Sequence, residues 1–233
     1  MISIIIPAHK EKHNLACRIT ELLSLEHSNK VEVLVALSPN SPDDFGREKC
    51  PNVTYISCTK KGRAVQMNQA SVLAKGDILV FLHADVKPPK TFLSDIDNAI
   101  LQGQDAGFFS YKFDKDSLLL RLNASFTGKD GVFTGGGDQC LFIKKSVFEK
   151  LGRFNEEQVL MEDFEFFKRM KKNKVPYTIV KSDLVVSARK YESNSYVRVN
   201  LSNLLLVMLF NMGCSSKKLK SLHDKLLRTP YNG

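Results

Sequence analysis

The sequence predicts an α/β protein with a mostly parallel sheet that is flanked by helices. Two observations support this prediction. Apolar runs of strand length alternate with segments of helical periodicity from Ser3 to Asp85, which is the order of strand–helix–strand units. The apolar runs are also nearly continuous, which is typical of strands that helices cover on both faces.

Four strands are expected in this first part of the chain. They are the apolar segments SIIIPAH, KVEVLVAL, NVTYISC and DILVFLH, at residues 3–9, 30–37, 52–58 and 77–83. One helix is expected over residues 11–25. A second is predicted over residues 62–76, which carry apolar and amide side chains at helical spacing and end in a glycine.

The second half is predicted to be less regular. The segments expected there are helices at 91–101, 117–126, 145–154 and 161–174, a strand at 107–114, a pair of strands at 177–191, and terminal helices. The helix at 161–174 has acidic residues at its start and basic residues at its end, which suits the helix dipole. No linker interrupts the chain, so one compact domain over residues 1–233 is predicted.

Composition narrows the class of protein. The chain has 233 residues, of which 43% are hydrophobic and 25% charged, an ordinary globular balance. Its five cysteines are odd in number and form no CxxC pair, which argues against a disulfide framework or structural zinc and favours a reducing, cytoplasmic location. The N-terminal segment is interpreted as a strand rather than a signal peptide. The longest apolar run, residues 204–213, is shorter than the ~20 residues that cross a bilayer, so a soluble protein that at most touches a membrane is expected.

The net charge of +9 is unevenly distributed. Residues 181–233 contain nine Lys or Arg and three Asp or Glu, a net charge of +6. Such a segment suits an anionic partner, whether phosphate groups, a membrane surface or nucleic acid. A solvated basic helix explains the same charges equally well.

Polar residues follow three of the predicted strands, at 7–10, 38–44 and 83–85. The carboxyl ends of parallel strands meet at one edge of a sheet, where ligands bind, so the first part of the chain is interpreted as a nucleotide-binding half. His83 and Asp85 at the end of the fourth strand offer an imidazole and a carboxylate. This pair suits Mn²⁺ or Mg²⁺, with diphosphate oxygens completing the coordination. A strand end that simply meets water is the alternative.

Two further segments carry groups that suit a ligand. Lys60, Lys61 and Arg63 surround a glycine just before a helix, where backbone amides and a guanidinium bind phosphate well. An ordinary basic loop is the alternative. Asp138 and Gln139 follow three consecutive glycines that allow close approach of the backbone, although glycines also form plain turns.

Candidate reacting groups occur near the end of the predicted domain. Glu162 and Asp163 stand at the threshold of a helix. Asp163 is either the helix cap or a general base that is held ionised by the helix N-terminus. Arg189 and Lys190 follow a strand and are either surface residues or groups that neutralise a leaving diphosphate.

The order of these segments is more specific than any one of them. SIIIPAHKE, GRAVQMNQA, GDILVFLHAD, GGGDQCLFIKKSVFEKLGRFNE and MEDFEFFKRM follow one another along the chain. Together they closely resemble the family 2 glycosyltransferases over about Ile2 to Tyr191. More narrowly, they resemble the bacterial subgroup whose strand-end metal motif is H-A-D where relatives have D-x-D.

The resemblance implies a GT-A fold, in which a Rossmann-like nucleotide-binding half (1–100) joins an acceptor and catalytic half (101–191), here followed by a basic helical tail (192–233). It implies a nucleotide-sugar donor, UDP- or GDP-linked, a hydroxyl acceptor, Mn²⁺ or Mg²⁺, and inversion at the anomeric carbon. A lipid-linked acceptor would agree with the apolar run and with the lysines that follow it, which would contact the inner face of the membrane.

Roles for individual residues also follow from the resemblance. The donor would contact Pro7, Ala8, Glu11, Arg63, Asp85 and Arg189. The metal motif would be Asp85 with His83, and Asp138 and Gln139 would face the sugar and acceptor. Asp163 would be the catalytic base with Glu162 beside it.

One departure from the family pattern stands out. Leu37 occupies the position where family members usually have an aspartate that binds the nucleobase, with Asp43 and Asp44 as the nearest substitutes. A non-catalytic GT-A scaffold that binds a nucleotide or an anionic partner is therefore the alternative. Nucleic-acid binding is not expected, because no basic helix carries interleaved aromatic residues. A nucleotidyltransferase would have a glycine-rich loop with an arginine after the first strand, where PAHKEKHN stands instead.

Overall fold

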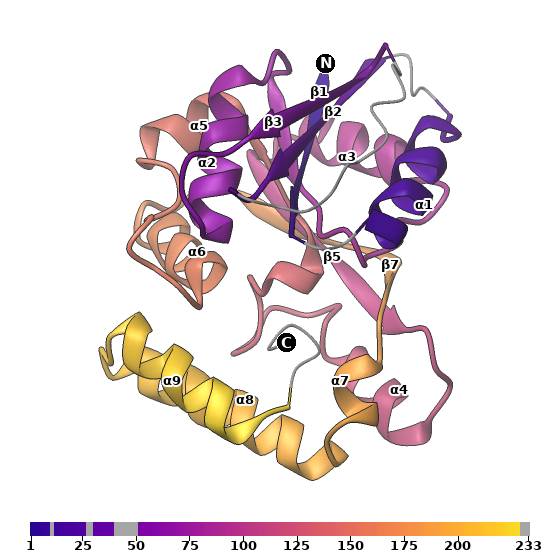
Figure 1. Ribbon diagram of the computed structural model, residues 1–233. Helices are drawn as coiled ribbons and strands as arrows, with labels where there is room; N and C mark the ends of the chain where they lie inside the picture. The colour runs from indigo at the N-terminus through magenta and orange to yellow at the C-terminus, as the bar shows by residue number, and fades with distance from the viewer. Residues whose placement is uncertain (10–11, 27–29, 40–50, 229–233) are drawn as a thin grey trace.

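The computed structural model describes residues 1–9, 12–26, 30–39 and 51–228. Its centre is a seven-stranded sheet with strand order β3-β2-β1-β4-β6-β5-β7 (Figure 1). The strands are β1 Ile2–Ala8, β2 Val31–Leu37, β3 Val53–Ser57, β4 Ile78–Phe81, β5 Ala106–Phe113, β6 Leu141–Lys144 and β7 Tyr177–Val186. Neighbouring strands run parallel except β6, which is antiparallel to β4 and β5. The predicted α/β fold with a mostly parallel sheet is confirmed.

Helices lie on both faces of the sheet and below one edge. Their bounds are α1 Lys12–Leu23, α2 Arg63–Leu73, α3 Phe92–Leu101, α4 Leu118–Ser125, α5 Lys145–Lys150, α6 Glu162–Lys172, α7 Arg189–Glu192, α8 Tyr196–Asn211 and α9 Ser216–Leu226, with a 3₁₀ turn η2 at Gly137–Gln139. Helices α1 and α3 bury side chains against one face. Helices α2, α5 and α6 cover the other.

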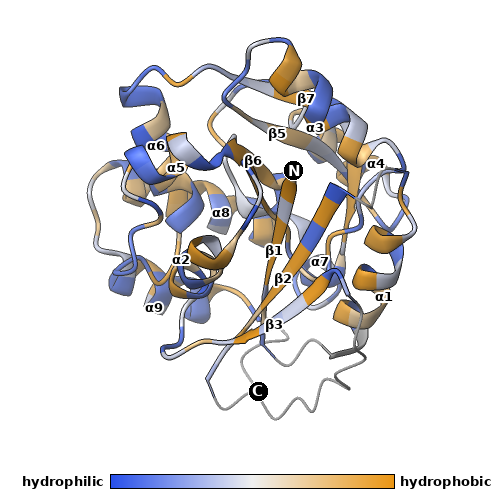
Figure 2. Cartoon of the chain, turned by 90° about the horizontal axis from the view of Figure 1, so that it is seen from above, coloured by the Kyte–Doolittle hydropathy of each residue, from blue (hydrophilic) through white to orange (hydrophobic). Residues whose placement is uncertain are grey.

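The apolar strands explain this layered arrangement. In β1, Ile4 and Ile6 pack into one apolar cluster and Ile5 packs into the other, and all three are completely buried. Each such side chain contributes roughly 1.5–3 kcal/mol by leaving water. Figure 2 shows hydrophobic colouring along β1 and β2 in the middle of the molecule and hydrophilic stretches on the helices around them.

One expected element differs in the structure. Residues 177–191 form the single strand β7 followed by the short helix α7, not a pair of strands. The pairing of β7 with β5 shifts register between Phe109 and Tyr111, where β7 has additional residues. There Ser110 donates a hydrogen bond to the Asp183 carboxylate at 2.6 Å. The predicted pair of strands is therefore one strand with a bulge.

The direction of the strands determines where a site can form. Strands β1, β4 and β5 all end at the same edge of the sheet, because β6 reverses direction between the last two. Helices α7, α8 and α9 and the nearby α4 lie beyond that edge, in the lower part of Figure 1. Within the residues described, no helix is both long and apolar enough to cross a membrane.

Candidate active site

The end of β4 places His83 and Asp85 at this edge. The strand continues as far as Leu82, whose amide donates to the Ile5 carbonyl at 3.0 Å. The chain then turns, and Lys87 forms a two-way backbone bridge with Val185 of β7, at 2.8 and 2.9 Å. This bridge fastens the loop after β4 beside the end of β7, where α7 begins.

Asp85 contacts the first residue of α7 close to this bridge. Arg189, the first residue of α7, donates through Nη2 to Asp85 Oδ2 at 3.1 Å. The two residues are 104 positions apart in the sequence. The structure thus brings together a predicted metal ligand and a predicted diphosphate-binding arginine as an ion pair.

Arg63 is the centre of a second group of charged side chains. Its Nε donates to Glu162 Oε1 at 2.6 Å, and its Nη2 lies 3.8 Å from Asp163 Oδ2. Its Nη1 lies 3.3 Å from His83 Nε2. On the other side of the imidazole, His83 Nδ1 is 3.7 Å from Asp138 Oδ1. The start of α2, the end of β4, η2 and the start of α6 therefore converge on one charged cluster.

The entry to α6 presents its two acidic residues to Arg63. Met161 adopts a left-handed backbone (φ 65°) immediately before the helix, and no side chain caps the helix there. Glu162 is buried, and Asp163 lies within the first turn. The interpretation of Asp163 as a helix cap is therefore wrong, because Met161 occupies that position.

Gly137 permits the close packing of the cluster. A Cβ atom at this position would lie 2.5 Å from His83 Cε1 and 2.6 Å from Asp163 Oδ2. Both distances are far below van der Waals contact, so any side chain would push apart the histidine and the carboxylate. The predicted close approach of the backbone at the triple glycine is thus real, and it serves the cluster itself.

Gln139 has a different environment from its neighbour Asp138. The Asp138 side chain is 64% exposed to solvent. Gln139 is buried, accepts a hydrogen bond from the Gly135 amide at 2.9 Å and donates to the Thr127 carbonyl at 3.0 Å. Its amide group is thus directed into the loop and holds the loop's shape.

The electrostatics of the cluster distinguish its carboxylates. Burial, and then the adjacent Glu162 carboxylate, raise the pKa of Asp163 to about 6. Although the Asp138 side chain is mostly exposed, nearby protein atoms oppose its ionisation, but the charges of His83 and Arg63 lower its pKa overall. Burial and Arg63 disfavour imidazolium at His83, yet Asp138 and Asp163 raise its pKa. Of Asp138 and Asp163, it is therefore Asp163 whose protonation changes nearer to neutral pH.

The predicted nucleoside pocket lies at the ends of β1 and β2. Pro7 and Ala8 end β1, and the Ala8 carbonyl accepts a hydrogen bond from Gln66 Nε2 at 3.1 Å. The same nitrogen donates to the Ala36 carbonyl of β2 at 2.7 Å. Sequence reasoning missed Gln66, although a buried amide among apolar residues of α2 was the available signal. Leu37 ends β2 and packs against the core.

Three of the expected donor-binding groups lie outside the described residues: Glu11, Asp43 and Asp44. The two lysines of the predicted phosphate-binding segment, Lys60 and Lys61, are exposed just before the start of α2.

The described residues offer few ligands for a divalent cation. They contain no group of three or more His, Cys, Asp or Glu side chains that could hold a metal ion. His83 and Asp85 supply an imidazole nitrogen and a carboxylate, a donor set of the right chemistry but only two ligands. These residues fit Mn²⁺ or Mg²⁺ when oxygen atoms of a bound diphosphate complete the coordination.

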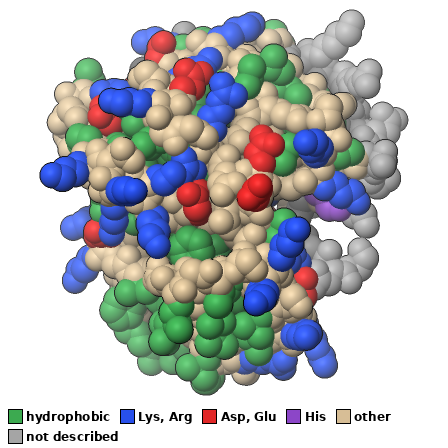
Figure 3. Space-filling view, turned by 90° about the vertical axis from the view of Figure 1, so that its left-hand side faces the viewer, with side chains coloured by type: hydrophobic (Ala, Val, Ile, Leu, Met, Phe, Trp, Pro, Cys, Tyr) green, Lys and Arg blue, Asp and Glu red, His purple; other side chains and the backbone are tan. Residues whose placement is uncertain are grey.

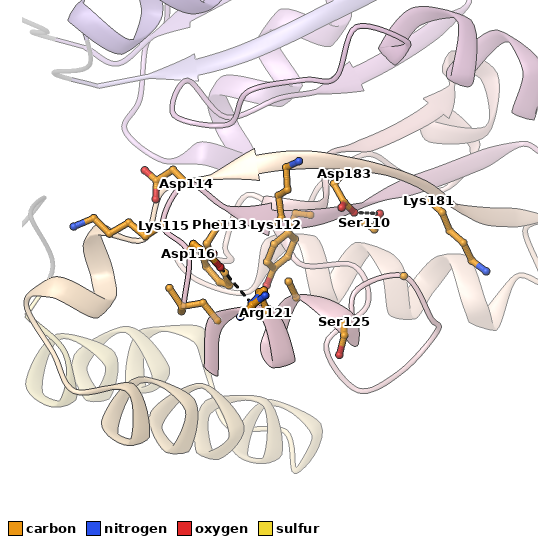
Figure 4. A pocket seen from close by; sticks show the side chains of 14 residues that line it. Ser110, Lys112, Phe113, Asp114, Lys115, Asp116, Arg121, Ser125, Lys181 and Asp183 are labelled. Carbon is orange, nitrogen blue, oxygen red and sulfur yellow. Dashed lines mark hydrogen bonds and ion pairs between the residues drawn. The ribbon is translucent and has the colours of Figure 1, made fainter. Parts of the chain in front are cut away.

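An open groove lies between the end of β5, the bulged middle of β7 and helix α4 (Figure 4). It measures about 600 Å³. Its charged lining residues are Lys112, Asp114, Lys115, Asp116, Arg121, Lys181 and Asp183. A second cavity of about 270 Å³ lies between α4, α7 and α8 and is lined by Leu119, Leu120, Tyr191 and Tyr196 among others. The lining of the first groove lies within residues 101–191, the predicted acceptor half, whereas the second cavity is also lined by Glu192 and Tyr196 of the segment that follows.

Comparisons with solved structures show related folds. The crystal structure of S. aureus TarS 1–349 in complex with UDP-GlcNAc is 16% identical, with a TM-score of 0.65, covering 97% of this chain and 71% of that one. The mannosyltransferase PcManGT from Pyrobaculum calidifontis in complex with GDP-Man and Mn²⁺ is 18% identical, with a TM-score of 0.66, covering 97% and 68%. At these identities the likeness shows the shared GT-A fold.

Comparisons of the sequence itself give two results. No curated protein matches the chain. The model of the family described as glycosyl transferase family 2 matches residues 3–169, which include the ends of β1 and β4, the triple glycine and the start of α6. The chain therefore belongs to glycosyl transferase family 2 and is a glycosyltransferase with a GT-A fold.

Proposed function

We propose that the protein transfers a sugar, with inversion, from a UDP- or GDP-linked donor to a hydroxyl group of an acceptor. The observation that carries this proposal is the position of Asp163. It is a largely buried carboxylate with a pKa of about 6, and it faces Arg63 and His83 at the edge of the sheet where the strands end. A group that changes protonation so close to neutral pH suits general base catalysis.

Asp163 accepts the proton of the acceptor hydroxyl in this proposal. The oxygen then attacks the anomeric carbon from the face opposite the nucleotide, so the configuration inverts. Glu162 makes no direct contact with the reacting atoms. It holds Arg63 through the 2.6 Å hydrogen bond and raises the pKa of its neighbour Asp163.

The two arginines serve the leaving group. Arg63 and Arg189 lie on either side of the residues that follow β4. Their guanidinium groups stabilise the negative charge that grows on the diphosphate as the glycosidic bond breaks. Asp85 orients Arg189 toward this position through its 3.1 Å contact.

A divalent cation belongs to the same proposal. Asp85 and His83 would hold Mn²⁺ or Mg²⁺ together with the diphosphate, and the bound ion would act as a Lewis acid on the leaving group. The TM-score of 0.66 to a mannosyltransferase solved with GDP-Man and Mn²⁺ supports this assignment.

Donor and acceptor are assigned to the two sides of the cluster. Residues 1–100, with Pro7, Ala8 and Arg63, bind the nucleotide, and residues 101–191, with Asp138, bind the sugar and acceptor. Gln139 positions the loop that carries Asp138. The acceptor is a hydroxyl compound linked to a lipid, and the protein meets it in the cytoplasm at the inner face of the membrane.

Titration calorimetry with UDP and with GDP, each with and without Mn²⁺, tests the donor part of this proposal. Binding of one nucleotide that requires Mn²⁺ and is lost in Asp85→Ala is the expected result. The nucleotide that binds also identifies the base of the donor. If neither nucleotide binds to the folded protein, Leu37 has removed the base-binding site and the proposal is wrong.

A further inference from the structure

The helix α8 has apolar side chains on two opposite faces. One face packs into the protein through Val199, Leu206 and Val207, which are buried. The other is exposed to solvent by 41–77% and consists of Val197, Leu201, Leu204, Leu205, Met208 and Met212. These six residues are here called the α8 stripe. Except for the adjacent pair Leu204 and Leu205, they are spaced three or four positions from one another, so they form one continuous face.

The apolar surface continues on a neighbouring helix. Asn123 of α4 donates hydrogen bonds to Asn200 of α8 at 3.1 Å and to the Tyr191 hydroxyl at 2.8 Å, which holds α4 beside the N-terminal half of α8. The exposed apolar residues of α4 and of the turn that follows it are Leu118, Leu119, Leu122 and Phe126. Monomeric soluble proteins rarely leave so many large apolar side chains together in water.

Basic residues lie beside this surface on α9, which packs along α8. Three of them are exposed: Lys217, Lys218 and Lys225. Among the described residues, none of these three lysines forms an ion pair with a carboxylate. Lys220, in contrast, pairs with Asp224 at 2.6 Å. Figure 3 shows the apolar patch across the lower part of one face, with Lys and Arg side chains next to it.

We infer that the α8 stripe and α4 dock the protein on a bilayer of anionic phospholipid, with the lysines of α9 in contact with the headgroups. An apolar helix face bordered by lysines suits the boundary between headgroups and acyl chains. A second copy of the chain fits less well. A two-fold contact through α8 would bring the basic residues of both copies together, and each chain carries a net charge of +9.

The surface also borders the second cavity, which lies between α4, α7 and α8. Leu119, which is exposed on α4, lines the 270 Å³ cavity together with Tyr191 and Tyr196. A lipid-linked acceptor would thus enter along aromatic walls. The identity of this acceptor rests on the proposed function, whereas the docking surface does not.

Vesicle co-sedimentation without any sugar nucleotide tests the docking surface by itself. The full chain is mixed with vesicles of phosphatidylcholine alone or with about 30% phosphatidylglycerol. We expect partitioning at least about tenfold stronger onto the anionic vesicles, and a comparable loss of binding at about 0.5 M NaCl. Equal binding to both vesicle types, or binding to neither, overturns the inference even if nucleotide binding is intact.

Two variants and one matched control locate the surface. Leu201→Glu with Met208→Glu removes apolar contact, and Lys217→Glu with Lys218→Glu changes only solvated charges and preserves the fold. Each should lower partitioning onto anionic vesicles about tenfold or more. Leu101→Glu, at an exposed leucine at the end of α3, should bind like the wild type.

Two results would contradict this location. Variants of α8 and α9 that bind vesicles like the wild type would place the contact elsewhere. A wild type that is dimeric by light scattering, and becomes monomeric in the Leu201→Glu, Met208→Glu variant, would show that a second copy covers the stripe.

Discussion

Arg63 and Glu162 form a 2.6 Å ion pair that joins the start of α2 to the start of α6 over 99 positions of sequence. Glu162 is 2% exposed, so the pair stands at the inner end of the cluster, whereas the Arg63 side chain also reaches Asp163 and His83. The Arg63 guanidinium thereby connects Glu162, Asp163 and His83. The properties of Asp163 depend on this connection.

Glu162→Gln should shift the pH dependence of transfer. The Glu162 charge is the second cause of the raised pKa of Asp163, after burial. Its removal lowers that pKa, so the acidic limb of kcat/KM against pH should move from about 6 toward lower pH. An acidic limb that stays in place would show that Asp163 is not the group that titrates.

Because the pKa of Asp163 is raised in the folded protein, its ionised form destabilises the fold above pH 6. The folded-state pKa of about 6 lies above the unfolded value of about 3.9. Folding therefore takes up a proton between these values, and the free energy of unfolding falls as the pH rises through this window. Asp163→Asn removes the effect, and should raise the free energy of unfolding by at most about 3 kcal/mol above pH 6.

Urea denaturation of the wild type and Asp163→Asn at two pH values checks this prediction. At about pH 4 the Asp163 carboxyl is mostly protonated in the folded state, so the two proteins should be equally stable there. A variant that is less stable than the wild type at pH 7.5 would mean that the weak contact with Arg63 outweighs burial.

Gly137→Ala should reduce transfer strongly. The added methyl group meets His83 and Asp163 at 2.5 and 2.6 Å, and must displace one of them from the cluster. Because a small misplacement of catalytic groups costs about 10²-fold, a loss of that size in kcat is expected. Gly131→Ala is the control, since nothing lies within 4 Å of its added Cβ atom. Equal rates in the two variants would contradict the packing of η2 against the base.

Gln66→Ala should destabilise the fold rather than only the site. Its side chain is buried and donates to backbone carbonyls of both β1 and β2. Its removal leaves two buried carbonyls with fewer partners, a cost of about 1–3 kcal/mol in urea denaturation. Gln69→Ala, on the same helix but bonded to Thr59 at the surface, should change stability by less. The reverse order would show that the ends of β1 and β2 do not need this amide.

Much of the site was predictable because it follows from the direction of the strands. His83 and Asp85 could be placed at the sheet edge from the apolar run before them, and the order of motifs along the chain indicated the family. The resemblance to that family, not the position of Asp163 at the start of a helix, led to its prediction as the base. These inferences use local pattern and parallel pairing, which the sequence carries directly.

The remaining features depend on contacts between distant residues. No local pattern indicates that Arg63 pairs with Glu162, or that Gln139 turns its amide into the loop while Asp138 is exposed to solvent. The bulge at Asp183 depends on Ser110, which lies 73 positions away, so the sequence of residues 177–191 could not distinguish one bulged strand from the predicted pair of strands. The stripe on α8 was visible as an apolar run, but the tertiary packing decides which of its residues are buried.

A direct comparison of wild type and Asp163→Asn tests the central claim that Asp163 is the catalytic base. Nucleotide affinity by calorimetry and the rate of sugar transfer in a single turnover are measured on the same preparations. The account predicts nearly unchanged nucleotide affinity and a rate that is lower by about 10²–10⁴-fold or more. A variant that transfers sugar at the wild-type rate would contradict the account and assign the proton transfer to another group.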